Sequence, residues 1–175
     1  MPEIEYVEDR MESEELLERL CPPVRNWFKD KFPDFTEPQK VAIPRILNGE
    51  HLLLCSPTGS GKTLTAFLTI IDDLVRRSLD GSLPDAVQCV YISPIKALAN
   101  DIEKNLMGPL GEIKERYLPS RAKEIKVGLR TGDTPQSERE KMLRKPPHIL
   151  ITTPESLGLG LASKRFRPIL DQMKW

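Results

Sequence analysis

Two hydrophobic periods alternate along this chain of 175 residues. Short apolar runs bounded by glycine, proline or polar residues predict strands, and runs with an apolar residue at every third or fourth position predict helices. The predicted strands are 51–55, 87–92, 125–129 and 148–152. The predicted helices are 37–47, 64–77 and 95–107, with a further helix starting at Pro154. This alternation predicts an α/β fold of three layers, in which helices cover both faces of a mainly parallel sheet.

The length suits one ordinary domain, and 39% apolar residues are enough to form a core. Residues 1–20 carry eight acidic and two basic residues, which predicts a polar helix or a loosely ordered segment. We therefore expect an acidic lead-in at residues 1–26 and a main domain at residues 27–175. Because the whole chain has 26 basic and 26 acidic residues, the part after residue 20 is mildly basic. Such a charge suits a polyanionic partner, and an ordinary solvated surface accounts for it equally well.

The three cysteines, Cys21, Cys55 and Cys89, include no C-x-x-C pair, so the sequence predicts neither a disulfide framework nor a zinc site. We expect a reduced, cytoplasmic setting, with association with the nucleoid if the source is prokaryotic. No apolar run approaches the roughly 18 residues that a membrane span requires, and an acidic N-terminus is unlike a signal peptide. No membrane partner is therefore expected.

The most specific motif is Ser56-Pro57-Thr58-Gly59-Ser60-Gly61-Lys62-Thr63, which lies between a predicted strand and a predicted helix. Glycines let backbone N–H groups converge on an anion, and the N-terminus of the following helix adds its positive dipole end. Lys62 is expected to reach the β- and γ-phosphates of ATP, and the Thr63 hydroxyl to bind Mg²⁺. By chance, the last six residues of this motif would occur in about one chain in 10⁵ of this length.

Two other predicted strands end in Ser93-Pro94 and Thr153-Pro154, just before helices. Serine and threonine favour the helix N-cap and proline the first turn, so ordinary capping explains either dipeptide taken alone. In a parallel sheet these helix starts would share the carboxyl edge, where α/β proteins bind ligands. The residues expected to hold a nucleic-acid backbone there are Pro94, Lys96, Asn100, Thr131, Gly132, Asp133, Thr153 and Pro154.

Together these motifs resemble the first RecA-like domain of superfamily 2 helicases of the DEAD/DEAH type. The segment 93–101 is similar to their motif Ia, 130–134 to the segment after the third strand, and 151–157 to motif Ib. Among these helicases the combination is most similar to the large helicase-related group. The resemblance implies ATP-dependent movement along nucleic acid, with DNA favoured, RNA as the alternative, and a 3′→5′ direction.

Upstream of the phosphate loop, residues 35–40 resemble the Q motif, in which a glutamine recognises adenine. Gln39 fits this role because its amide can both donate and accept a hydrogen bond, and a plain surface glutamine is the alternative. The aromatic residue that DEAD-box proteins place further upstream has no clear match, although Phe28 or Phe32 could substitute.

The family's next element is a strand ending in Asp-Glu, and the sequence contains no adjacent Asp-Glu pair. We expect the chain to stop before this Walker B strand, so that it binds nucleotide without hydrolysing it and belongs with the remainder of a helicase chain. Two other interpretations remain open. One is a stand-alone P-loop binding module without catalysis, and the other is a P-loop NTPase of another class, such as a kinase or GTPase, which the absence of an Asn-Lys-x-Asp string disfavours.

Overall fold

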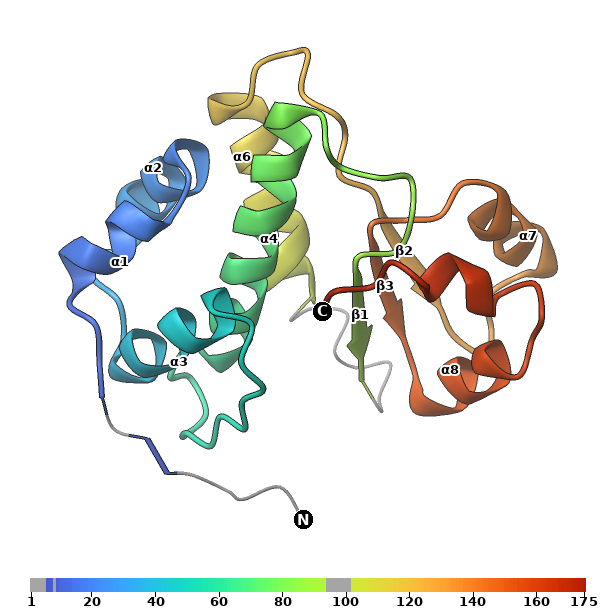
Figure 1. Ribbon diagram of the computed structural model, residues 1–175, viewed down its shortest axis with the longest axis horizontal. Coiled ribbons are helices and arrows are strands. Elements are labelled where there is room, and N and C mark those ends of the chain that lie inside the picture. The colour runs from blue at the N-terminus through green and yellow to red at the C-terminus, as the bar shows by residue number, and fades with distance from the viewer. Residues whose placement is uncertain (1–5, 8, 94–101) are drawn as a thin grey trace. The chain divides into compact units, whose positions relative to one another are not determined.

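A computed structural model of the chain describes residues 6–7, 9–93 and 102–175 (Figure 1). The chain forms two compact units. Unit 1 comprises Met1–Arg76 and Glu103–Ser120, and unit 2 comprises Arg77–Ile102 and Arg121–Trp175. Most of the predicted helix 95–107 therefore lies outside the described residues.

Unit 1 is built from helices (Figure 1). The predicted helix at 37–47 is present with those bounds, and the predicted helix at 64–77 is longer at both ends, so that its last residues belong to unit 2. The elements are α1 (Ser13–Arg19), α2 (Pro22–Lys31), α3 (Glu37–Leu47), α4 (Lys62–Asp80), the π-helix η2 (Glu103–Met107) and α6 (Gly108–Tyr117).

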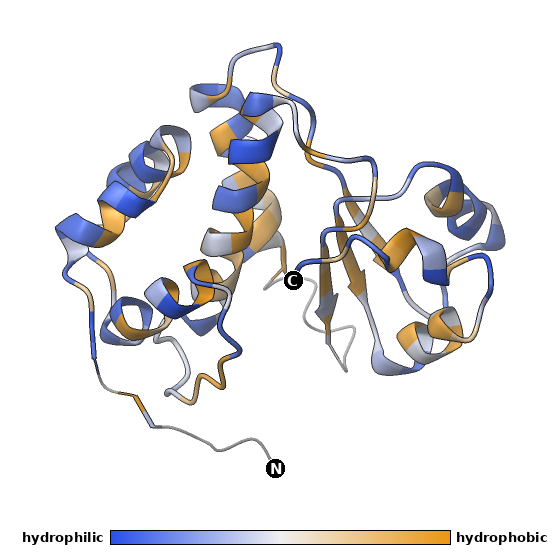
Figure 2. Ribbon diagram, viewed as in Figure 1, coloured by the Kyte–Doolittle hydropathy of each residue, from blue (hydrophilic) through white to orange (hydrophobic). Residues whose placement is uncertain are grey.

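Helix α4 follows the phosphate loop, and its apolar residues recur at spacings of three and four. That spacing gives the helix one continuous apolar stripe, visible in orange in Figure 2. The buried residues of this stripe include Leu64, Phe67, Leu68, Ile71, Leu74 and Val75. Burial of this stripe fixes the helix, and with it the position of the loop that precedes the helix.

A buried carboxylate joins α2 to α4. Asp72, which is 1% exposed, accepts hydrogen bonds from the backbone N–H of Cys21 at 2.6 Å and from Nε of Arg76 at 2.7 Å. Cys21 is the N-cap of α2, so the carboxylate lies at the positive end of that helix. Burial, and then the nearby Asp72 carboxylate, raise the pKa of the Cys21 thiol to about 12, so this thiol stays protonated.

Helix α2 also contacts α6 through side chains. The Trp27 indole donates to Glu112 at 2.7 Å, Lys31 forms an ion pair with the same carboxylate at 2.8 Å, and the Tyr117 hydroxyl donates to Asp30. Lys31, followed by Trp27, holds the pKa of Glu112 below its usual value. The ion pair of Lys31 with Glu112 is partly exposed, so its contribution is small beside the burial of apolar side chains such as Trp27.

Unit 2 contains a parallel sheet of three strands, β1 (Cys89–Ile92), β2 (Val127–Arg130) and β3 (Ile149–Thr152). The strands follow the order β1-β3-β2, and both ladders are parallel. Three of the four predicted strands are therefore present, and the predicted α/β fold with a parallel sheet is confirmed.

Helices α7 (Gln136–Arg144) and α8 (Pro154–Leu161) and the 3₁₀-helix η3 (Arg167–Leu170) complete unit 2 (Figure 1). Side chains from the sheet, from α7 and from η3 meet around the fully buried Phe166. The residues of this core are Val87, Val90, Met142, Leu143, Leu150, Phe166, Ile169 and Leu170. The core therefore holds α7 and the C-terminal segment against the sheet.

The predicted strand at 51–55 is wrong. These residues have no strand conformation, and Leu53 is 83% exposed. An extended segment is stable in a sheet only when a neighbouring strand pairs with it, and no described residue pairs with 51–55 in a ladder. Within unit 2, the side of β1 away from β3 pairs with the end of the chain, because Trp175 N–H donates to the Gln88 carbonyl and Val90 N–H donates to the Trp175 carbonyl, each at 2.9 Å. This is the hydrogen-bond pattern of a parallel pair.

None of the helices formed by the described residues has both the length and the apolar composition needed to cross a membrane.

His148 lies at the start of β3 and is fully buried. Its Nδ1 accepts a hydrogen bond from the Lys126 backbone N–H at 2.9 Å, and its own backbone bonds to residues that precede both neighbouring strands. Burial, followed by the charges of Lys123 and Lys126, lowers the pKa of His148, and Asp85 opposes this shift. The folded protein therefore holds the neutral imidazole.

We expect the free energy of unfolding to fall as the pH decreases through the histidine range. The lowered pKa means that the unfolded chain binds this proton first, so the stabilisation is present above the unfolded pKa of about 6.5 and is lost as the pH falls through the folded value. For one proton, the free energy of unfolding changes by at most about 1.4 kcal/mol per pH unit. Urea unfolding between about pH 7.5 and 5.5 would measure it.

His148→Asn keeps a side-chain acceptor for Lys126 and should remove this slope, although it lowers stability at every pH. The matched control is His51→Asn, because His51 is the other histidine and is exposed. Equal slopes in the parent chain and in His148→Asn would contradict the assignment.

Candidate nucleotide and nucleic-acid sites

The phosphate-loop motif, residues 56–63, forms a compact turn ahead of α4 in unit 1. Gly59 and Gly61 have φ values of 85° and 86°, in the left-handed region that other residues avoid. The Ser56 hydroxyl donates to the Ser60 hydroxyl at 2.7 Å across the turn. The glycine positions predicted for an anion-binding backbone therefore take the conformation for which glycine is needed.

Lys62 folds back over the loop. Its ammonium group donates to the carbonyl of Pro57 at 2.7 Å and to the carbonyl of Ser56. An ammonium group has three donors and no acceptor, so loop carbonyls are suitable partners until an anion replaces them. Thr63 follows in the first turn of α4 and is half-buried. A phosphate in the loop would compete with these carbonyls for the Lys62 charge.

Helix α3 supports the loop through Thr36 and Gln39. The Thr36 hydroxyl donates to the Ser60 carbonyl at 2.9 Å, and Oε1 of Gln39 accepts from the Thr36 backbone N–H at 2.9 Å. Gln39 is only 3% exposed, so it is not a plain surface glutamine. A Cβ atom built on Gly61 would lie 2.7 Å from Nε2 of Gln39, which means that the amide packs directly on the loop. Sequence reasoning missed the role of Thr36.

The two loop glycines should respond differently to alanine. Gly59→Ala adds only the strain of a left-handed residue, about 1–2 kcal/mol, because nothing lies within 4 Å of its Cβ position. Gly61→Ala adds a similar strain and also a clash with Gln39, for which we expect about 1–3 kcal/mol more. The free energy of unfolding of the two variants, measured in urea, checks this difference.

In a second arm, Gln39→Ala would be combined with Gly61→Ala. The clash should disappear, so the two changes together should cost less than the sum of the single changes. Additive costs would show that Gln39 does not contact Gly61.

In unit 2, the carboxyl ends of all three strands meet at one edge. Thr152 of β3 is in register with Ile92 of β1 and with Arg130 of β2. The residues that follow these strands therefore share the edge, as predicted for Thr131 and Thr153. Pro94, Lys96 and Asn100, which belong to the same prediction, lie outside the described residues.

Ser93, the last described residue after β1, was not among the predicted contacts. Its backbone N–H donates to the Thr152 carbonyl at 3.0 Å, and its hydroxyl is buried with no hydrogen-bond partner among the described residues. The predicted helix start at Thr153 and Pro154 is present, since Pro154 begins α8 and Thr153 Oγ1 accepts from Ser156 N–H at 3.3 Å. The Glu155 backbone N–H, followed by the Thr153 hydroxyl, lowers the pKa of the Glu155 carboxyl.

Arg139 of α7 braces the loop of Thr131, Gly132 and Asp133 through hydrogen bonds to its backbone. The Arg139 guanidinium donates to the carbonyls of Thr134 at 2.8 Å, Thr131 at 3.1 Å and Gly132 at 2.8 Å. Thr134 Oγ1 also accepts from the Thr131 N–H at 2.8 Å. Sequence reasoning missed Arg139, and the signal for it was an arginine in the first turn of the helix after the Thr-Gly-Asp loop.

Arg130, the last residue of β2, stacks on the ring of Phe166 with its guanidinium carbon 3.9 Å from the ring centre. Burial, and then the charge of Arg139, lower the pKa of Arg130. The stacked cation thus links the carboxyl edge of the sheet to the core of unit 2.

Arg139→Ala should destabilise the loop at 131–134 because three carbonyls lose their common donor. We expect a loss of about 1–3 kcal/mol, and a smaller loss for Arg139→Lys, whose single ammonium group cannot match the planar fork. Urea unfolding and amide hydrogen exchange at residues 131–134 measure the effect. Arg121→Ala is the matched control, since Arg121 is an exposed arginine of unit 2. An Arg139→Ala variant as stable as this control would exclude the bracing role.

A glycine turn at the start of a buried helix, together with a parallel sheet whose polar strand ends share one edge, defines a P-loop protein of the α/β class. The sequence pattern of the DEAD/DEAH box helicase family matches residues 36–175, and the chain belongs to this family.

Relatives give a narrower placement. The chain is 47% identical to the ATP-dependent helicase Lhr-Core of Methanocaldococcus jannaschii, over 100% of this chain and 21% of that protein. It is 53% identical to the Lhr-Core helicase of Methanothermobacter thermautotrophicus, over 89% of this chain and 18% of that protein. The resemblance to the large helicase-related group is therefore confirmed, and the chain spans about a fifth of the length of these relatives.

Among solved structures, the helicase Lhr of Mycobacterium smegmatis bound to ssDNA and AMP-PNP is similar to this chain. The TM-score is 0.78 and the sequence identity is 44%, over 90% of this chain and 20% of that chain. The RecA-like fold predicted from the motifs is thereby confirmed.

Proposed function

We propose that this chain is the ATP-binding and nucleic-acid-binding part of an ATP-dependent helicase or translocase, which acts with the remainder of a longer helicase chain. In this proposal, residues 27–175 belong to the first RecA-like domain and residues 1–26 form an acidic lead-in. DNA is the favoured substrate, RNA the alternative, and 3′→5′ the direction of movement. The observation that carries the proposal is the phosphate loop. Two glycines in the left-handed conformation lie directly before α4, and the chain belongs to the helicase family.

The loop fits a nucleoside triphosphate. Lys62 is already directed at the loop carbonyls and would exchange them for the β- and γ-phosphate oxygens. Backbone N–H groups of residues 58–61 would hold the same phosphates, and the Thr63 hydroxyl would bind Mg²⁺, which neutralises phosphate charge. Gln39 would recognise adenine through hydrogen bonds of its amide. Because this amide packs on Gly61, its position would change when phosphates bind in the loop.

The carboxyl edge of unit 2 suits a phosphate backbone. Thr131, Gly132 and Asp133 form a braced loop beside the N-terminus of α8, where Thr153 and Pro154 begin the helix. We assign the backbone contacts to these residues together with Pro94, Lys96 and Asn100. The relative from M. smegmatis, which is bound to ssDNA, supports this assignment. Contacts of this kind hold phosphate and sugar and carry little base specificity.

Hydrolysis needs a carboxylate that holds the metal ion and positions water, and these 175 residues contain no adjacent Asp-Glu pair. A stand-alone binding module without catalysis is therefore the second candidate. The first candidate acts with further chain that supplies hydrolysis, whereas the second only binds its ligands.

A phosphate-release assay separates the two candidates. We expect the 175-residue chain to bind Mg-ATP weakly and to release no phosphate above background. The longer parent protein should hydrolyse ATP, faster when single-stranded DNA is added, and Lys62→Ala in the parent should abolish this activity. No DNA-stimulated hydrolysis by the parent would favour the binding module. Hydrolysis by the short chain that its own Lys62→Ala variant loses would instead place a catalytic carboxylate within these residues.

A further inference from the structure

Charge is divided unequally between the two units. Unit 2 contains 14 basic and 9 acidic residues, a difference of +5, whereas unit 1 contains 12 basic and 17 acidic residues, a difference of −5. Of the 14 basic residues of unit 2, only Arg130 and the predicted contact Lys96 are assigned to the carboxyl edge of the sheet, and Asp133 at the same edge is acidic. The positive charge of unit 2 must therefore be gathered elsewhere.

Helix α7 has two different faces. The inner face points into unit 2. Arg139 on this face braces the loop at 131–134, and Met142 and Leu143 join the core around Phe166. The opposite face borders an open hollow of about 510 Å³. Its lining residues are Ser137, Glu140, Lys141, Arg144 and Lys145, which we call the α7 basic face. Their spacings of three and four place them on one side of the helix.

The acidic member of this face is neutralised within the protein. Arg165 binds the Glu140 carboxylate with both terminal nitrogens, at 3.0 Å and 2.7 Å, and this ion pair lowers the pKa of Glu140. Lys141, Arg144 and Lys145 form no ion pair with any described residue. Arg144, one turn after Glu140, also lowers the pKa of that carboxyl through its charge. The face therefore presents three cations and one carboxylate, and Arg165 already binds that carboxylate.

The lining of the hollow indicates which kind of anion it accepts. Interfaces with protein partners depend on aromatic and apolar anchors. Every described residue that lines this hollow is polar or charged, and the apolar surface of the hollow comes from the stems of these side chains. Cations at adjacent turns of a helix lie about 5–6 Å apart, and arginine and lysine both bind phosphate oxygens. Polar donors without an apolar anchor favour a phosphate backbone over an acidic peptide.

The α7 basic face differs in place from the carboxyl edge. Helix α7 starts just after the loop at 131–134, and its C-terminal end leads into the start of β3. Lys141, Arg144 and Lys145 therefore lie toward the amino ends of the strands. A helix of nine residues is about 14 Å long, which corresponds to about four phosphates of one strand. A strand at the carboxyl edge would need several more nucleotides to reach these residues.

We propose that the α7 basic face is a second contact for the phosphate backbone, which holds nucleic acid flanking the strand at the carboxyl edge. The inference rests on the proposed function, since it assumes that the edge binds nucleic acid. The α7 basic face is a separate site, and we expect it to add affinity only for nucleic acid that is long enough to reach both the carboxyl edge and this face.

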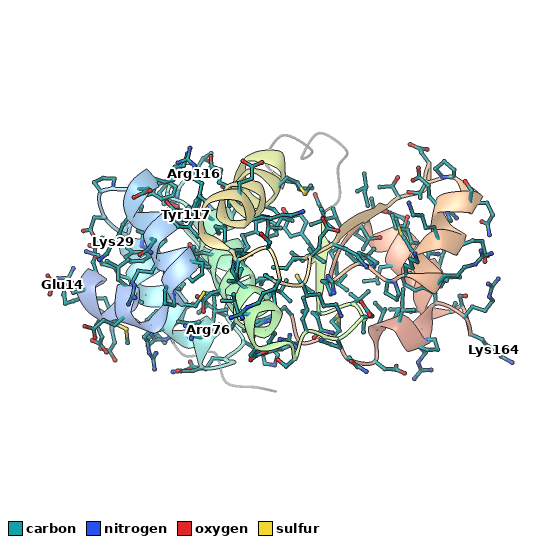
Figure 3. The ribbon with its side chains drawn as sticks, turned by 90° about the horizontal axis from the view of Figure 1, so that it is seen from above. Glu14, Lys29, Arg76, Arg116, Tyr117 and Lys164 are labelled. Atoms are coloured by element: carbon teal, nitrogen blue, oxygen red, sulfur yellow. The ribbon has the colours of Figure 1, made fainter. Side chains whose placement is uncertain are left out.

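The test compares two triple variants of this chain. One carries Lys141→Gln, Arg144→Gln and Lys145→Gln, and the matched control carries Arg19→Gln, Lys29→Gln and Arg116→Gln on exposed helix positions of unit 1. Figure 3 labels Lys29 and Arg116 on unit 1. Fluorescence anisotropy at several salt concentrations measures binding of labelled single strands of about 8 and about 24 nucleotides. Urea unfolding verifies that both variants remain as stable as the parent chain.

For the longer strand, the α7 variant should bind about tenfold or more weakly, and the salt slope should fall by about 2, as expected for three lost contacts at about 0.7 each. The shorter strand and the control variant should bind as the parent chain does. Equal binding of the long strand by both variants would overturn the inference, and so would an equal loss with both strand lengths. The same variants would also be titrated with a labelled polyglutamate peptide. If the α7 variant lost affinity for the peptide and kept its affinity for the long strand, the face would be assigned to an acidic protein partner instead. If the parent chain bound neither strand, the proposed function itself would be wrong.

Discussion

Parallel pairing of β3 with a strand on each side sets the layout of unit 2. Because all three strands run in the same direction and in register, Ile92, Arg130 and Thr152 end at one edge, and the segments that follow them are brought together. The pairing also places Gln88, Lys126 and His148 at the opposite edge, where their backbone hydrogen bonds begin the ladders. Helix α7 runs between these two edges. Its inner face braces the loop at 131–134 through Arg139, and its outer face carries the residues of the α7 basic face.

Two cations of this chain, Lys62 and Arg139, bind backbone carbonyls and not carboxylates. Lys62 bonds to carbonyls of the phosphate loop, and Arg139 bonds to those of the loop at 131–134. The first arrangement can give way to an anion, since an ammonium group exchanges partners freely. The second is a planar fork bound to three acceptors, so it acts as a brace. Lys141, Arg144 and Lys145 form no ion pair with a described residue, which is one reason why we propose them as contacts for a ligand.

The phosphate loop depends on packing more than its motif alone suggests. Two glycines give the turn its shape, but Thr36 and Gln39 of α3 fix its position through a bond to Ser60 and a close contact with Gly61. The buried stripe of α4 fixes the other end. A ligand that shifts Gly61 would therefore also move the Gln39 amide, so in the proposed function binding of the phosphates and recognition of the base would be coupled.

The sequence by itself determined the phosphate loop, the bounds of α3, three of the four strands and the helix start at Thr153, because each is a local pattern of period, capping or glycine conformation. It failed at residues 51–55, since an apolar run becomes a strand only when another strand pairs with it. Only the tertiary structure decided that Arg139 faces the loop at 131–134 and that Glu140 is neutralised by Arg165. The position of Arg139 after the Thr-Gly-Asp loop is a weak signal, and Arg165 is 25 residues from Glu140. Charge alone cannot tell an arginine that braces a loop from a solvated one.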